Sequence, residues 1–209
     1  KFDEAAIYWK ESITDYNTSG DSLKASVVLG NLGLVYERKG AYLEALSHYK
    51  ESVAMKERFG ASPQDLAITF NNIGIIYEVV GDYPLSIEYH KKALSIHENL
   101  NMKARVSSSL LNLANVYQEL DKAALAKSYF LQSVAIKEQL QDRWGISLCY
   151  NALGFLYLNE GKMDSSYYYF DQNYKLAKEI NAQEGIQSAI IGIAKWNLEN
   201  NRVSDAVEW

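Results

Sequence analysis

Six asparagines stand at related positions of a repeated pattern, and their carboxamides are the most distinctive polar groups of the sequence. Asn31, Asn72 and Asn112 occupy the same position in three successive repeats. The other three are Asn71 and Asn151, which share the neighbouring position, and Asn115, which follows Asn112 by three residues. Asparagine is a mediocre helix former, so its recurrence within helical segments needs a reason beyond propensity.

A carboxamide offers one acceptor and two donors, so it can pair with both the N–H and the C=O of a foreign backbone. Packed helices lie ~8–10 Å apart and an extended chain advances ~3.3 Å per residue, so one amide per repeat could hold about every third residue of a bound peptide. The alternative is that the amides bond to one another or to carbonyls between repeats, as structural links. The sequence leaves both interpretations open.

Apolar residues accompany the asparagines on the same side of the helical segments. Leu34, Ile75 and Phe155 share one position of the repeat, and together with the six asparagines we assign them to a peptide-binding groove. The same side also carries Val27, Ile68, Leu111 and Leu158. A contiguous apolar surface typically marks an interaction site. Since Arg38 and Lys195 are the cations of this side, we expect a ligand that is apolar with neutral or basic flanks.

The sequence offers no recurring set of catalytic or metal-binding residues. His90 stands where other repeats have a large aromatic residue, which favours a packed histidine over a catalytic one. His48 and His97 have no partner at metal-ligand spacing, and we expect them on exposed helix faces. Cys149 is expected to be a small buried hydrophobe. With no strand predicted and no phosphate-binding glycine loop, we predict neither enzyme activity nor a metal or cofactor.

These positions belong to a pattern that recurs about every 40 residues. Four segments align without a gap: 29–52, 70–93, 110–133 and 150–173. Each predicts two helices, and a small residue of the first helix faces a large residue of the second, as with Gly33 and Tyr49. The turn between the helices carries a residue type that tolerates the left-handed conformation: Gly40, Gly81, Asp121, Gly161 and Asn201.

We therefore predict one all-α array over residues 1–209, a right-handed superhelical solenoid of antiparallel helix pairs with eleven helical segments. Residues 1–20 would be the second helix of a truncated repeat. Full repeats would cover 21–61, 62–101, 102–141 and 142–181, and 182–209 would be incomplete. The last segment has about two turns and leaves apolar surface of the final repeat uncovered, so we expect end-to-end self-association or further chain in the parent protein.

The order of small, Leu-Gly, Tyr, Gly, Ala and aromatic positions resembles the tetratricopeptide repeat. The resemblance rests on segments such as "LGNLGLVYERKGAYLEALSHYKES" (29–52) and covers the whole chain. The period exceeds the common one of about 34 residues and the closing proline is missing. Both features are similar to the longer-helix subclass of kinesin light chains, of receptor-clustering and spindle-orientation scaffolds, and of bacterial peptide-responsive regulators.

The resemblance implies a scaffold that holds an extended or helical segment of a protein or peptide partner in a concave groove lined by the first helices. Kinesin-light-chain-like repeats carry a similar Asn-Asn pair, which favours the binding interpretation. The basic clamp with which cochaperone repeats hold an acidic C-terminus is not recognisable. The alternative is a ligand-sensing or regulatory module of a larger bacterial signalling protein, whose kinase, cyclase or DNA-binding output domain lies outside this chain.

Composition narrows the classes of partner. The 209 residues carry a formal charge of −5 and are 48% hydrophobic, as in well-packed proteins. Without a dense block of Lys and Arg, nucleic acid is not expected as a direct partner. No run approaches the ~18 apolar residues of a membrane span. The chain begins "KFDEAA", so we expect a piece of a longer protein. One cysteine does not determine the compartment; a cytoplasmic location is slightly favoured over a periplasmic one.

Overall fold

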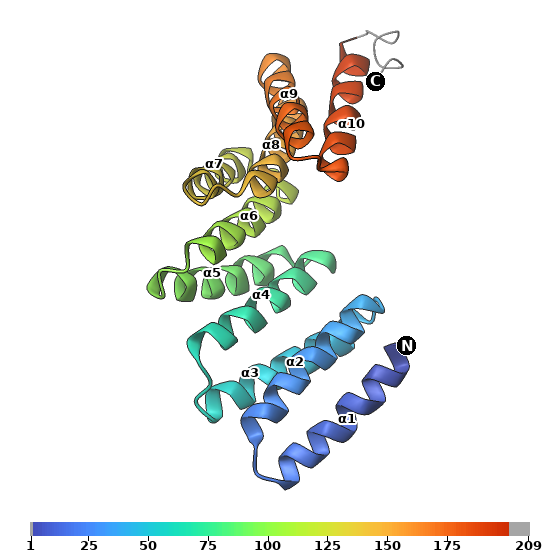
Figure 1. Ribbon diagram of the computed structural model, residues 1–209, viewed down its shortest axis with the longest axis vertical. Helices are drawn as coiled ribbons and strands as arrows, with labels where there is room; N and C mark the ends of the chain where they lie inside the picture. Colours follow the sequence, from blue (N-terminus) through green and yellow to red (C-terminus); the bar gives the residue numbers. More distant parts are fainter. Residues whose placement is uncertain (1, 201–209) are drawn as a thin grey trace. The chain divides into compact units, whose positions relative to one another are not determined.

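The computed structural model describes residues 2–200, with side chains for 7–9, 11–16 and 18–200. Within this range the chain forms ten α-helices and no strand (Figure 1). They are α1 Phe2–Thr18, α2 Ser22–Arg38, α3 Tyr42–Arg58, α4 Pro63–Val79, α5 Tyr83–Asn99, α6 Lys103–Glu119, α7 Ala123–Gln139, α8 Arg143–Asn159, α9 Met163–Glu179 and α10 Gln183–Glu199. The predicted all-α fold is confirmed. The predicted eleventh segment, 202–209, lies outside the described residues.

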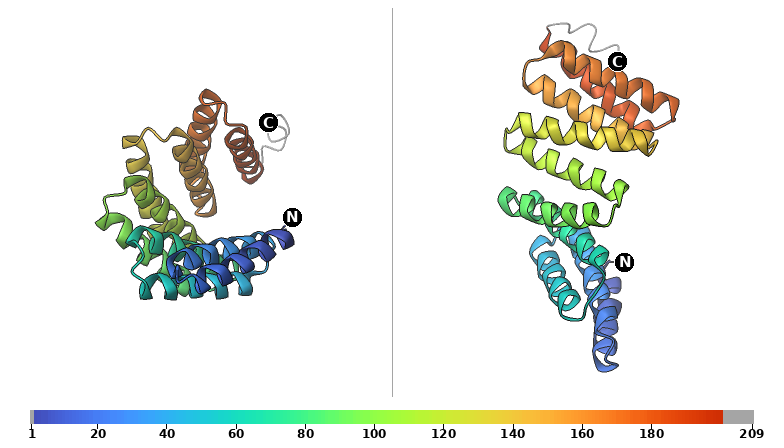
Figure 2. Two further views of the ribbon diagram at one scale, coloured as in Figure 1. Left: turned by 60° about the horizontal axis from the view of Figure 1, so that its bottom comes forward. Right: turned by 90° about the vertical axis from the view of Figure 1, so that its left-hand side faces the viewer.

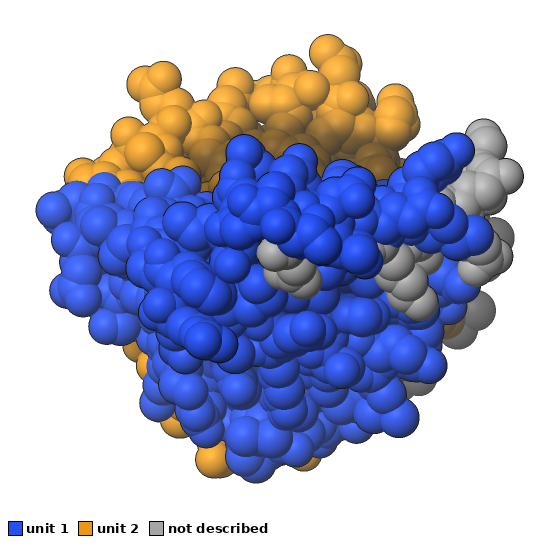
Figure 3. Space-filling view, turned by 90° about the horizontal axis from the view of Figure 1, so that it is seen from below, with its two compact units in different colours: residues 1–102 blue, residues 103–209 orange. Residues whose placement is uncertain are grey.

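The helices fall into two compact units, α1–α5 in residues 1–102 and α6–α10 in residues 103–209 (Figure 3). In unit 1, α2 pairs with α3 and α4 with α5, while α1 packs on α2 and α3 on α4. In unit 2, α6 pairs with α7 and α8 with α9, and α10 packs on both α8 and α9. In unit 2, consecutive helices run in opposite directions, as the green to red helices of Figure 2 show. The chain is thus an all-α solenoid of stacked helix hairpins.

Four helices begin at a side chain that caps the backbone. The side chains of Asp21, Ser62, Asp82 and Asp142 accept hydrogen bonds from backbone N–H groups in the first turns of α2, α4, α5 and α8. Such caps satisfy one of the N–H groups that a helix leaves unpaired at its start. Pro63 follows Ser62 as the first residue of α4, where its missing N–H costs nothing.

The turns use the left-handed backbone conformation. Inside the hairpins it is adopted by Gly40, Gly81, Asp121 and Gly161, with φ of 74°, 81°, 53° and 70°. Asn201, predicted to serve the same purpose, lies outside the described residues. The loops between hairpins repeat the conformation at Gly60, Asn101, Gln141 and Asn181. Gln141 is unexpected from sequence, because glutamine rarely has a positive φ.

Small residues of the first helices make room for large residues of the second. Tyr49, His90, Phe130 and Phe170 occupy one position of the repeat and are fully buried. A Cβ atom added at Gly33 would lie 2.7 Å from the ring of Tyr49, and one at Gly74 would lie 2.8 Å from the ring of His90. Since real Cβ atoms almost never come this close to a ring, glycine is required for the helices to approach to this distance.

A second set of ring contacts joins the helices of each hairpin. The first-helix tyrosines, Tyr36, Tyr77, Tyr117 and Tyr157, stack on His48, Tyr89, Tyr129 and Tyr169, with ring centroids 5.2, 5.7, 5.4 and 5.5 Å apart. The tyrosines recur at one position of the repeat, but the sequence does not identify their partners. In the run Tyr167–Tyr169, Tyr169 enters this packing whereas Tyr168 remains 56% exposed.

Basic side chains are buried at the junctions between hairpins. Nζ of Lys56 donates to Oγ1 of Thr69 at 2.7 Å and to the carbonyl oxygen of Asp65 at 3.1 Å, both in α4. Burial lowers the pKa of Lys56. Lys137 holds the same position two repeats later, and its Nζ donates to Oδ2 of Asp142 at 3.0 Å. These bonds satisfy cations that would otherwise be costly to bury, and they tie each hairpin to the next within its unit.

Candidate peptide-binding faces

In unit 1, the first helices expose rows of side chains opposite their buried stripes. The unit 1 rows are Val27, Asn31, Leu34 and Arg38 of α2, and Ile68, Asn72, Ile75 and Val79 of α4. Spacings of four and three residues place each row on one side of its helix. Four of the apolar members are exposed, Val27 to 49%, Leu34 to 37%, Ile68 to 38% and Val79 to 53%. The rows therefore present apolar surface to solvent.

The predicted site residues of unit 1 divide by burial. Asn31 and Leu34 are exposed on α2, whereas Asn71, Asn72 and Ile75 are half-buried on α4. Asn31 and Leu34 can meet a partner without a rearrangement of the hairpins. The residues on α4 are already partly occupied with packing.

Asn72 lies beside a polar contact of the neighbouring hairpin. The hydroxyl of Tyr49, on α3, donates to Oε2 of Glu37 at 2.7 Å, and the side chain of Asn72, on α4, is a polar neighbour of that hydroxyl. Burial, together with the nearby Glu37, raises the pKa of Tyr49 well above its ordinary value, so the hydroxyl keeps its proton. At this position the carboxamide has a polar neighbour within the chain, and both interpretations of the asparagines stay predictions.

We expect Asn72→Ala to lower the free energy of unfolding by up to about 1 kcal/mol, because the buried Tyr49 hydroxyl loses a polar neighbour. In a Tyr49→Phe background the same substitution should cost much less, since that hydroxyl is already absent. Denaturant unfolding of the four proteins of this cycle measures the coupling. Asn31→Ala, at the same repeat position but exposed, is the matched control and should change stability little. An equal cost of Asn72→Ala in both backgrounds would contradict this expectation.

The rows of unit 2 combine amides with aromatic and aliphatic side chains. They are Asn112 and Asn115 of α6, Leu148, Asn151 and Phe155 of α8, and Ile191, Lys195 and Leu198 of α10. Leu148, Ile191 and Leu198 are exposed to 38%, 55% and 53%. The three asparagines are half-buried, and Oδ1 of Asn151 is a buried acceptor without a hydrogen-bond donor among the described residues. An acceptor in this state is stabilised by any donor that reaches it.

A pocket of about 490 Å³ opens between α8 and α10, which pack against each other. Its lining is Phe155, Leu158, Asn159, Lys195, Leu198 and Glu199. The ring of Phe155 forms its apolar wall, held edge-to-face on Phe170 with ring centroids 4.9 Å apart. Nζ of Lys195 lies 5.4 Å from the centroid of the Phe155 ring. Phe155, Leu158 and Lys195 are predicted for this side from the sequence, whereas Leu198 and Glu199 come to the pocket through the packing of α10.

The nine predicted site residues are distributed over both units. Unit 1 contains Asn31, Leu34, Asn71, Asn72 and Ile75, and unit 2 contains Asn112, Asn115, Asn151 and Phe155. Within each unit they lie on the first helices of hairpins. One groove that joins all of them remains a prediction.

The histidines and the cysteine are packing residues. Burial lowers the pKa of His90 to about 4, and neither of its nitrogens has a hydrogen-bond partner in the described structure. His48 and His97 were expected to be exposed, which is wrong: His48 stacks on Tyr36, and His97, which holds the repeat position of Lys56 and Lys137, is 3% exposed. Cys149 is buried, and burial raises its pKa.

No group of three or more His, Cys, Asp or Glu side chains in the described part of the chain could hold a metal ion. Among the described helices, none is long and apolar enough to cross a membrane.

Two family models, both described as tetratricopeptide repeat, match residues 27–62 and 65–139, together more than half of the chain. No curated protein matches the sequence.

Several solved structures share the fold. BtubC (BKLC) from P. vanneervenii is 15% identical, with a TM-score of 0.83 over 100% of this chain and 87% of that one. Kinesin light chain TPR-like repeats from Podosopora anserina are 16% identical, with a TM-score of 0.71 over 86% and 89%. The Rap conjugation gene regulator of plasmid pLS20, in complex with the Phr* peptide, is 18% identical, with a TM-score of 0.77 over 92% of this chain and 53% of that one. At these low sequence identities, the similarity to the three structures shows a shared fold.

Proposed function

Since this chain belongs to the tetratricopeptide repeat family, we propose that it is a scaffold that binds an extended or helical segment of a protein or peptide on its first-helix rows. The repeat fold is a scaffold type, built to present surface rather than catalytic groups. The observation that carries the proposal is the exposed apolar row of α2 and α4, Val27, Leu34, Ile68 and Val79, on helices whose opposite sides are buried.

The polar groups beside these rows suit a peptide backbone. Asn31 is an exposed amide four residues from Val27 and three from Leu34. One side of α2 could therefore contact an apolar side chain of a bound peptide and also form a hydrogen bond with the peptide backbone. In unit 2, the unpaired Oδ1 of Asn151 and the Phe155 pocket offer the same combination of acceptor and apolar wall. The pLS20 Rap regulator, which has a similar fold, is described with a bound peptide, and this supports the choice of partner class.

The test uses peptides selected from a random display library on the wild-type chain, with affinities then measured by calorimetry. Leu34→Asp should weaken peptides that bind unit 1 by tenfold or more, because a carboxylate replaces apolar contact area. Asn31→Ala should weaken them by about tenfold, the effect of one lost hydrogen bond that leaves a partner group unpaired. Leu198→Asp is the corresponding variant for peptides that bind unit 2.

Leu43→Asp is the matched control, since Leu43 is 78% exposed on α3 and lies outside the rows. It introduces the same charge and should leave affinity within about twofold. All four replaced side chains are exposed, so melting temperatures should change little. Peptides that bind Leu34→Asp and Leu198→Asp as tightly as the wild type would contradict the proposal.

A regulatory module is the second candidate. The chain spans 53% of the pLS20 regulator, whose remaining length lies outside the shared fold. If the parent protein of this chain carries an output domain, peptide binding on the rows would act on that domain. Activity of that parent protein, measured with and without a selected peptide, separates the candidates: a peptide-dependent output supports the regulator, and an unaltered output supports the scaffold alone.

A further inference from the structure

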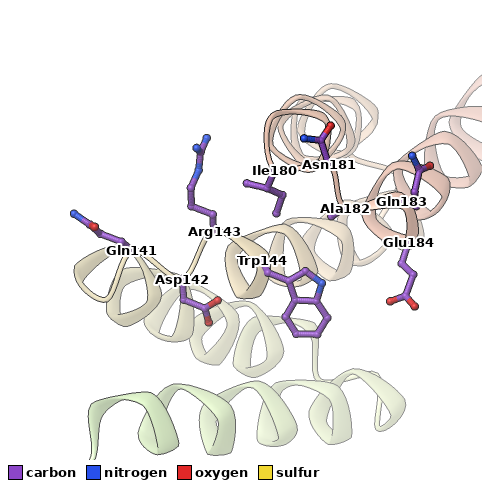
Figure 4. Close-up of a pocket in the computed structure, with 9 residues that line it drawn as sticks. All are labelled: Gln141, Asp142, Arg143, Trp144, Ile180, Asn181, Ala182, Gln183 and Glu184. Carbon is purple, nitrogen blue, oxygen red and sulfur yellow. The ribbon is translucent and has the colours of Figure 1, made fainter.

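A second pocket of unit 2 lies where two loops between hairpins meet, and its volume is about 700 Å³ (Figure 4). Residues 141–144 at the start of α8 and residues 180–184 at the start of α10 line it. None of the nine predicted site residues belongs to it. It combines one large aromatic surface with a carboxylate.

Trp144 provides the aromatic surface. Its side chain is 53% exposed in the first turn of α8, and Figure 4 shows the indole extending from the helix along the pocket. The corresponding positions of the other first helices carry Leu23, Gln64, Ala104 and Glu184, so the repeat does not require a tryptophan here. An exposed indole is a large flat surface with a negative face, which attracts cations.

The charges around Trp144 leave one carboxylate available. Asp142 uses Oδ1 to accept from the N–H of Gly145 at 2.9 Å and Oδ2 to accept from Lys137 at 3.0 Å. Arg143 pairs with Glu179 and extends away from the indole (Figure 4). Glu184, in the first turn of α10, extends to the same side as the indole, and no ion pair occupies it among the described residues.

We propose that this pocket binds an arginine side chain of a partner protein, with the guanidinium stacked on the indole of Trp144 and paired with the carboxylate of Glu184. A guanidinium is planar and weakly hydrated, so it can stack on an aromatic face and bond to a carboxylate at the same time. The net charge of −5 favours the approach of a basic segment. The pocket uses none of the residues that carry the proposed function, so different variants test the two proposals.

The test is an NMR titration of the 15N-labelled chain with the peptide acetyl-Gly-Arg-Gly-amide. The Trp144 indole N–H resonance, identified by its absence in Trp144→Ala, should shift saturably, together with the amides of residues 183–185. The same peptide with citrulline, which is neutral and of the same shape, should give no saturable shift. Affinity for the arginine peptide should also fall as salt is raised, because both charges are partly exposed.

Glu184→Gln and Trp144→Ala should each raise the dissociation constant by about two- to fivefold, the range for exposed ion pairs and cation–π contacts. Glu98→Gln is the matched control, an exposed carboxylate of unit 1, and should leave the constant unchanged. Melting temperatures of the variants show whether the fold is kept. Equal binding of the citrulline peptide, preferential binding of acetyl-Gly-Glu-Gly-amide, or no shift at Trp144 would each overturn the proposal.

Discussion

Replacement of Phe170 by alanine is expected to lower the free energy of unfolding of unit 2 by about 3–5 kcal/mol. The ring is fully buried in α9 and is shared by three helices. A Cβ atom added at Gly154 of α8 would lie 2.5 Å from the ring of Phe170, and one added at Gly192 of α10 would also lie too close to this ring. With glycine on two sides, α8 and α10 offer no side chain at these two positions to fill the space that the ring leaves.

The measurement is denaturant unfolding followed by circular dichroism, with Phe170→Leu as a graded variant of intermediate cost. Tyr168→Ala is the control on the same helix, because Tyr168 is 56% exposed and its loss should cost well under 1 kcal/mol. Phe155 rests on Phe170, so Phe170→Ala should also weaken peptides that bind the pocket between α8 and α10. A loss below 1 kcal/mol for Phe170→Ala would mean that the three helices close over the cavity.

Lowering the pH from 7 to 4 is expected to remove about 3 kcal/mol of stability through His90 alone. The side chain is fully buried, and burial lowers its pKa from 6.5 to about 4 in the folded chain. Between these two values the unfolded chain binds a proton that the folded chain does not, so stability falls as pH falls. Above pH 6.5 both states are neutral and the contribution vanishes.

His90→Phe isolates this effect. Phe130 and Phe170 hold the same repeat position, so a phenyl ring is compatible with the packing there. The variant should be more stable than the wild type at pH 7 by about 1–3 kcal/mol, because two buried nitrogens without hydrogen-bond partners are removed. Its advantage should then grow as pH falls to 4. The carboxylate that faces His90, Glu78 with Oε2 3.9 Å from Nε2, is unchanged in both proteins. Parallel stability curves for the two proteins from pH 7 to 4 would contradict the assignment.

Two roles are predicted for the asparagines, and the variants distinguish them. Asn72 is a neighbour of a buried tyrosine hydroxyl that is present in this repeat because Tyr49 stands where others have Phe or His. Asn31 is exposed, so its contribution should appear in binding and not in stability. Under the proposed function, peptide binding at the rows would therefore rest on Asn31 and the apolar residues in unit 1, and on Asn151 and Phe155 in unit 2.

Local sequence alone determined the helices, their turns and the side of each first helix that packs. Gly40, Gly81, Asp121 and Gly161 could be assigned to turns because a left-handed residue restricts the choice of side chain wherever it occurs. The pairing of Gly33 with Tyr49 could be predicted because a small residue opposite a large one recurs at fixed spacing. Both depend on interactions within one hairpin, which a periodic sequence repeats and so makes visible.

Tertiary structure decided what depends on how separate hairpins meet. The approach of Asn72 to the Tyr49 hydroxyl and the pocket of Trp144 and Glu184 both join residues of different hairpins within one unit. Exposure was equally invisible in the sequence, since Asn31 and Asn72 share a repeat position but differ in burial. The physical reason is that contacts between hairpins depend on the angle and distance at which whole helices pack, and these are set by many side chains together rather than by any one repeat position.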